Sequence, residues 1–147
     1  MGVRMNQIKL PEQTPAADKQ SALQAIGGLV QSVRDDVTAS YPSHKEDVRM
    51  LSIYGMFYNG IGDAVAGEKV LTEAHTLAPR KQLLSFDLTR SYLMQNKSKE
   101  AYEIARDTYN LSIICNDASK WYLLSSVYAG KYLEARADVE KREQKRI

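Results

Sequence analysis

The sequence contains few of the residues that build disulfides, metal centres and many active sites. Its 147 residues include one cysteine and two histidines. The single Cys115 cannot form a disulfide within the chain, and we expect it to be a small buried apolar residue. His44 and His75 have no further histidine or cysteine at the spacing of metal ligands. The sequence therefore predicts no metal site and no cofactor.

Long apolar runs and a charge excess of either sign are also lacking. No segment approaches the roughly 20 apolar residues of a membrane span, and the first residues lack the apolar stretch of a signal peptide. Lys and Arg number 20 against 18 Asp and Glu, which gives a net charge of +2. This balance excludes the strongly basic surface that nucleic-acid binding requires. We expect a soluble domain that binds no nucleic acid.

Catalytic motifs are missing as well. Residues 62–69 resemble a phosphate-binding loop, but Glu68 stands before the lysine and Val70 replaces the required Ser or Thr. The neighbouring hydroxyls of Ser125 and Ser126 have no motif that would supply a base or an oxyanion loop. We therefore predict that the chain is not an enzyme.

What the sequence does have is a period of 34 residues. A residue that tolerates a left-handed backbone recurs at this interval, and a small residue follows it five positions later in each copy. The turn positions are Gly62, Asn96 and Gly130, and the small positions are Gly67, Ala101 and Ala135. Such a period is the signature of stacked helical hairpins.

The repeated unit resembles the tetratricopeptide (TPR) repeat. The copies span about 48–81, 82–115 and 116–147. The first matches the motif's large, small and proline positions with Leu51, Tyr54, Gly55, Tyr58, Gly67, Leu71, Ala74 and Pro79, and the third contains Trp121-Tyr122-Leu123-Leu124-Ser125-Ser126-Val127-Tyr128. The resemblance implies an all-α, right-handed superhelical array of antiparallel hairpins with about seven helices and three repeats. Because Tyr128 lies seven residues before Ala135, against nine for Tyr58 and Gly67, either two residues are missing at the third turn or the tyrosine has changed position.

Hydrophobic periodicity and helix-stop signals divide the chain further. Residues 1–19 are expected to form a flexible lead-in, and residues 20–147 a helical repeat domain. The predicted helices span about 21–39, 45–59, 63–77, 80–95, 98–111, 118–129 and 132–145, with a loop at 40–44 and N-caps at Asp63, Ser98 and Asp117. The first helix is interpreted as the second helix of a degenerate preceding repeat, and the charged last helix as a cap that closes the array.

In TPR arrays the first helix of each repeat lines a groove for a peptide or partner helix. The resemblance places eight candidate residues there: Arg49, Ser52, Met56, Asn59, Leu83, Phe86, Arg90 and Tyr122. The two arginines suit a carboxylate, and Met56, Phe86 and Tyr122 suit apolar contacts. These residues predict a site for binding a protein or peptide.

A narrower resemblance covers about residues 41–135. Segments 41–49, 57–63, 73–82 and 88–93 are similar to the soluble C-terminal repeat region of bacterial O-antigen ligase or polymerase-like membrane proteins. This implies a non-catalytic accessory domain, cytoplasmic or periplasmic, tethered through a membrane-embedded parent protein. Two alternatives stay open: a free-standing cytoplasmic adaptor or assembly factor, and an enzyme or small-ligand receptor built on a repeat scaffold.

Overall fold

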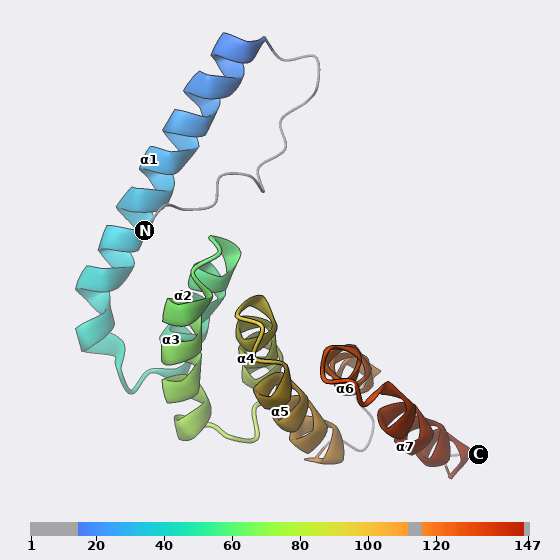
Figure 1. Ribbon diagram of the computed structural model, residues 1–147. Coiled ribbons are helices and arrows are strands. Elements are labelled where there is room, and N and C mark those ends of the chain that lie inside the picture. Colours follow the sequence, from blue (N-terminus) through green and yellow to red (C-terminus); the bar gives the residue numbers. More distant parts are fainter. Residues whose placement is uncertain (1–14, 112–115, 146–147) are drawn as a thin grey trace.

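A computed structural model describes residues 15–111 and 116–145 of the protein, and in this part helices joined by short turns are the regular secondary structure, without strands. Seven α-helices and one short 3-10 helix follow one another (Figure 1). They are α1 (Ala16–Ser40), η2 (Tyr41–His44), α2 (Val48–Gly60), α3 (Ala64–Leu77), α4 (Gln82–Met94), α5 (Ser98–Leu111), α6 (Asn116–Tyr128) and α7 (Tyr132–Gln144). The predicted all-α array of helical hairpins is confirmed.

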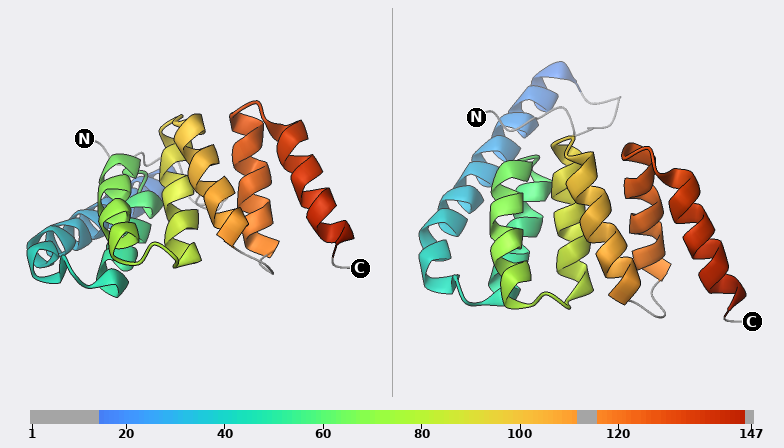
Figure 2. Two further views of the ribbon diagram at one scale, coloured as in Figure 1. Left: turned by 90° about the horizontal axis from the view of Figure 1, so that it is seen from below. Right: turned by 60° about the horizontal axis from the view of Figure 1, so that its bottom comes forward.

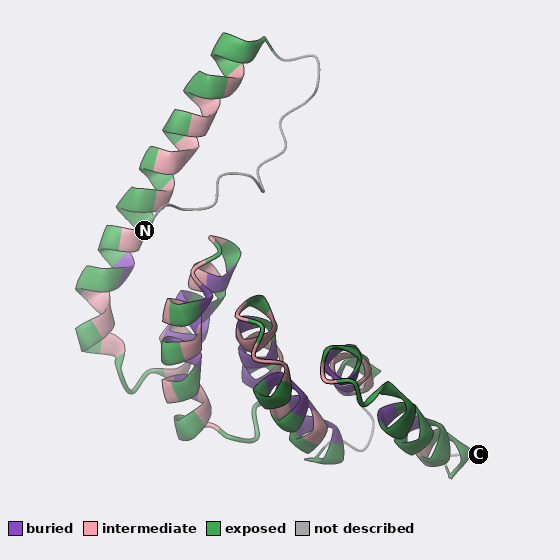
Figure 3. Cartoon of the chain, in the orientation of Figure 1, coloured by how far each residue is buried: buried purple, intermediate pink, exposed green. Residues whose placement is uncertain are grey.

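Three hairpins stand side by side in the order of the sequence (Figure 2). The pairs α2–α3, α4–α5 and α6–α7 form the hairpins, and α3 packs on α4 as α5 packs on α6. The first helices α2, α4 and α6 are also neighbours. Much of α1 extends away from this array, and Val37 near its C-terminal end is its only buried residue (Figures 1 and 3).

The three turns within the hairpins share one conformation. Gly62, Asn96 and Gly130 have φ of +85°, +59° and +70°, in the left-handed region that glycine and asparagine tolerate best. The following residue donates its backbone N–H to a carbonyl near the end of the first helix. These bonds join Asp63 to Tyr58, Lys97 to Tyr92 and Lys131 to Ser126 over 2.9, 2.9 and 2.8 Å. The turn conformation therefore recurs with the same 34-residue period as the sequence pattern.

The same hydrogen bonds settle the register of the third repeat. Ser126 takes the position of Tyr58 and Tyr92, so no residue is missing at the third turn and the tyrosine has changed position. Tyr128 lies at the end of α6 and is 62% exposed. Tyr122 takes the buried position of Tyr54 instead, which displaces the motif alignment of residues 121–128 by two residues.

Small residues occupy the closest approaches between paired helices, as the period predicts. A Cβ added to Gly67 would lie 2.4 Å from Asn59 Oδ1 on the facing helix α2. Ala101 and Ala135 hold the equivalent positions and have no exposed surface. Larger side chains at these three positions would force the two helices of a hairpin apart.

Several predicted helix limits need correction. Helix α1 begins at Ala16, so residues 16–19 are not a loose lead-in: Pro15 needs no N–H at a helix start, and the alanines after it are strong helix formers. Asp63 caps α3 as predicted, accepting from the Ala66 N–H over 3.2 Å. Ser98 and Asp117 instead lie inside the first turns of their helices. Of the predicted loop at 40–44, Ser40 ends α1 and residues 41–44 form η2. The lead-in at 1–14 and Cys115 lie outside the described residues.

Replacing Ala101 with leucine tests the close approach of α4 and α5. Because Ala101 is fully buried, the added methyl groups should overpack this crossing and lower the free energy of unfolding by about 1–3 kcal/mol. Urea denaturation followed by circular dichroism measures the change. The matched control is Ala137→Leu on the exposed side of α7, which should leave stability nearly unchanged. Equal stabilities of the two variants would contradict the packing described here.

Candidate interaction surface and junction pocket

The repeat register brings the exposed sides of α2, α4 and α6 onto one surface, which we call the first-helix surface. Of the residues predicted to line a groove, Arg49, Met56, Leu83 and Arg90 are exposed there. Met56 and Leu83 are 49% and 51% exposed, although both are large apolar side chains. The prediction missed further exposed apolar residues on the same helices, among them Ile53, Met94 and Leu124. Leu124 lies one 34-residue step beyond Arg90, so the period alone points to it.

Three of the predicted groove residues do not line this surface, because they are buried between helices. The exposures of Ser52, Asn59 and Tyr122 are 6%, 2% and 0%. Asn59 joins two hairpins: its Nδ2 donates to the Asp87 carbonyl over 3.0 Å, and its Oδ1 accepts from Ser91 Oγ over 2.8 Å. Ser52 has the repeat position of Phe86, whose ring faces the next first helix. These residues support the array.

Tyr122 points into the core of the last two hairpins. Its ring stacks on Tyr109 at a centroid distance of 4.9 Å, and its hydroxyl donates to Asp138 Oδ2 over 3.0 Å. Burial raises the pKa of the Tyr122 phenol above its ordinary value, and the hydrogen bonds with Tyr102 and Asp138 raise it further. The hydroxyl is therefore neutral and structural.

Phe86 is intermediate in exposure between the exposed and the buried residues of the predicted groove. It is half-buried, and its ring stacks on Trp121 of α6 with a centroid distance of 6.3 Å and an angle of 15°. The two rings join neighbouring first helices and form one aromatic face. Trp121 thus belongs to the surface, although the motif alignment placed it elsewhere.

Asp87 lies on α4 at the repeat position of Ile53 and Trp121. Its Oδ2 is buried and has no hydrogen-bond partner among the described residues. Burial raises the pKa of the Asp87 carboxyl, while the nearby charge of Arg90 lowers it.

A second candidate site lies where successive hairpins meet, on the edge that carries the turns. Here one side chain of a second helix contacts the residue after the next turn. Arg34 binds Asp63 at 2.8 Å, and one period later Glu68 binds Lys97 at 2.6 Å. Gln95 also donates to Glu68 Oε2 over 2.6 Å. We call these positions junction contacts.

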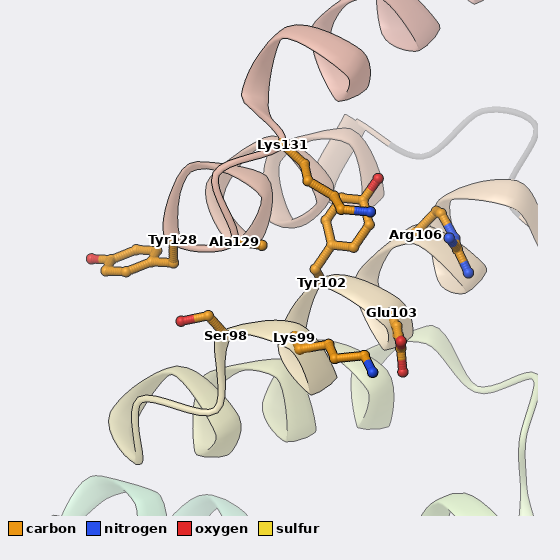
Figure 4. Close-up of a pocket in the computed structure, with 8 residues that line it drawn as sticks. All are labelled: Ser98, Lys99, Tyr102, Glu103, Arg106, Tyr128, Ala129 and Lys131. Atoms are coloured by element: carbon orange, nitrogen blue, oxygen red, sulfur yellow. The ribbon is translucent and has the colours of Figure 1, made fainter.

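The third junction contact is different in kind, because Tyr102 stands where the previous junction has Glu68. Lys131 lies over the Tyr102 ring, with Nζ 5.1 Å from its centroid. A pocket of about 350 Å³ opens beside this contact (Figure 4). It is lined by Ser98, Lys99, Tyr102, Glu103 and Arg106 of α5, and by Tyr128, Ala129 and Lys131 at the end of α6 and the turn after it.

Comparison of the chain with protein-family models, curated proteins and solved structures found no match. Within the described residues, no helix combines the length and apolar character that crossing a membrane requires. Across residues 15–111 and 116–145, no three His, Cys, Asp or Glu side chains are grouped so as to hold a metal ion.

The raised pKa of Asp87 predicts how stability depends on pH. Because the folded state disfavours the charged carboxylate, ionisation of Asp87 opposes folding at neutral pH, and this penalty disappears below the ordinary carboxyl pKa. Asp87→Asn should therefore raise the free energy of unfolding at pH 7, and the gain should vanish at strongly acidic pH. Urea denaturation across pH measures both. Asp36→Asn on the exposed part of α1 is the control, and a pH-independent gain would contradict the assignment.

Proposed function

We propose that this protein is a non-catalytic protein-interaction module whose first-helix surface binds an extended peptide or a helix of a partner. The observation that carries the proposal is the set of large apolar side chains exposed along α2, α4 and α6. Ile53, Met56, Leu83 and Leu124 are each 44–51% exposed. Large apolar side chains that are exposed on one surface favour a site of protein interaction.

Charge and aromatic residues on the same surface support a ligand of mixed character. Arg49 and Arg90 are exposed and form no ion pair with the carboxylates of the described residues. Their guanidinium groups suit bidentate contact with carboxylates. On the same surface, Met56 offers an adaptable apolar contact. The Phe86–Trp121 pair offers a rigid aromatic contact. The favoured ligand therefore combines acidic and apolar side chains.

The sequence resemblance supports a more specific proposal, that the module is the soluble accessory domain of an O-antigen ligase or polymerase-like membrane protein. The alternative is a free-standing cytoplasmic adaptor or assembly factor. The complete reading frame distinguishes them. A series of apolar spans encoded upstream in the same frame supports the first, and a start at Met1 with no such spans supports the second.

The role of the arginines can be tested with a partner isolated on the immobilised chain. Replacing Arg49 and Arg90 together with glutamine should weaken binding about tenfold or more, because two carboxylate contacts are lost. Affinity for the unchanged chain should fall as salt rises, since added salt shortens the range of attraction between exposed charges, which is about 8 Å at physiological ionic strength. Calorimetric titration measures both effects.

The control changes the same number of charges elsewhere. Lys141 and Lys145 are exposed on and just after α7, and their joint replacement with glutamine should leave affinity unchanged. Circular dichroism of both variants checks that the helices persist. An unchanged affinity of the Arg49→Gln, Arg90→Gln variant would place the binding site outside the first-helix surface.

A further inference from the structure

The pocket at the third junction contact can be compared with the equivalent junction one repeat earlier. There the carboxylate of Glu68 lies between two donors, Lys97 Nζ and Gln95 Nε2, each 2.6 Å from the same oxygen. The three side chains close the junction between the first and second hairpins. At this junction the ion-pair partner of the turn lysine Lys97 is therefore Glu68 of the same chain.

At the next junction the acidic group is missing. Tyr102 replaces Glu68, and its side chain is 2% exposed, with its hydroxyl 3.4 Å from that of Tyr122 in the core. Ala129 replaces Gln95 and provides no side-chain donor. The turn lysine is retained as Lys131, which forms no ion pair with any carboxylate of the described residues. Tyr102 and Ala129 therefore leave open a space that Glu68 and Gln95 fill in the preceding junction.

The electrostatics of the emptied space favour an anion. Lys99, Arg106 and Lys131 line it with three positive charges, against the one carboxylate of Glu103. Arg106 is also paired with Asp107, outside the lining, at 3.5 Å, so Lys99 and Lys131 are the cations of the pocket without an ion pair among the described residues. Arg106 and Lys131 both lie over the Tyr102 ring, at 5.7 and 5.1 Å from its centroid. Figure 4 shows the end of Lys131 crossing the Tyr102 ring in this view, Arg106 to the right of the ring and Tyr128 on the far left. The ring holds both cations beside the pocket.

We propose that this pocket binds a carboxylate of an acidic peptide, which takes the place that Glu68 has in the preceding junction. Lys131 is the principal cation, as Lys97 is for Glu68. The carboxylate comes from a glutamate or aspartate side chain or from a peptide C-terminus. This site lies on the turn edge of the array and is independent of the proposed first-helix surface.

The test uses the full chain, labelled with ¹⁵N, and short blocked peptides of known chemistry. N-acetyl-Ala-Glu-Ala-amide should shift the backbone amide resonances of residues 98–102 and 129–131 in a saturable manner. N-acetyl-Ala-Gln-Ala-amide, which has the same shape without the charge, should not. A second pair, N-acetyl-Ala-Ala-Ala with a free or an amidated C-terminus, tests the other source of the carboxylate. Saturation by either acidic peptide supports the site and identifies its source.

Variants test whether Lys131 binds the peptide carboxylate as Lys97 binds Glu68. Lys131→Gln removes the principal cation from an exposed position and should weaken binding of the glutamate peptide at least fivefold. Lys141→Gln makes the same charge change on an exposed part of α7 and should not weaken it. The proposal is overturned if neither acidic peptide shifts these amides, if the glutamine peptide binds equally, or if Lys131→Gln has no effect. Shifts confined to the first-helix surface also overturn it, and they leave the proposed function standing.

Discussion

The structure depends on one backbone constraint, the left-handed turn that follows each first helix. A residue with positive φ at Gly62, Asn96 or Gly130 reverses the chain, and the next N–H closes the turn on the preceding helix. Because all three turns share this geometry, each second helix leaves its turn in the same direction and meets its partner at the same small residue. The hairpins therefore stack with equivalent residues in equivalent places.

Equivalent places do not have equivalent chemistry, and the candidate sites arise from that difference. The junction contact is an ion pair at Arg34–Asp63, an ion pair of reversed sign at Glu68–Lys97, and a cation–aromatic contact at Tyr102–Lys131. Repeat proteins tolerate such exchanges because each unit packs mainly on its neighbours. Here the third exchange leaves a lysine beside an open pocket. A similar divergence places Arg90 between Met56 and Leu124 on the first-helix surface.

Some of the residues predicted to line the groove instead support the packing of the hairpins. Asn59 satisfies a backbone carbonyl and a serine of the next hairpin, and Tyr122 forms the centre of a tyrosine cluster closed by the cation of Arg142 over Tyr109. Motif positions alone cannot distinguish these roles, because the first helix of a hairpin contacts several neighbouring elements and exposes only a narrow side. Which side remains exposed depends on the helices packed beside it.

The sequence by itself determined the helical class, the 34-residue period, the turn residues and the small crossing residues, because each follows from local backbone preference or from spacing along one helix. The TPR resemblance placed Arg49, Met56, Leu83 and Arg90 in a groove, and these four residues are exposed. Only the tertiary structure decided the register of the third repeat, the burial of Ser52, Asn59 and Tyr122, and the pairing of Phe86 with Trp121. The pocket beside Lys131 likewise needs contacts between residues 29 positions apart, since an open space is a property of packed neighbours and leaves no signal in either segment alone.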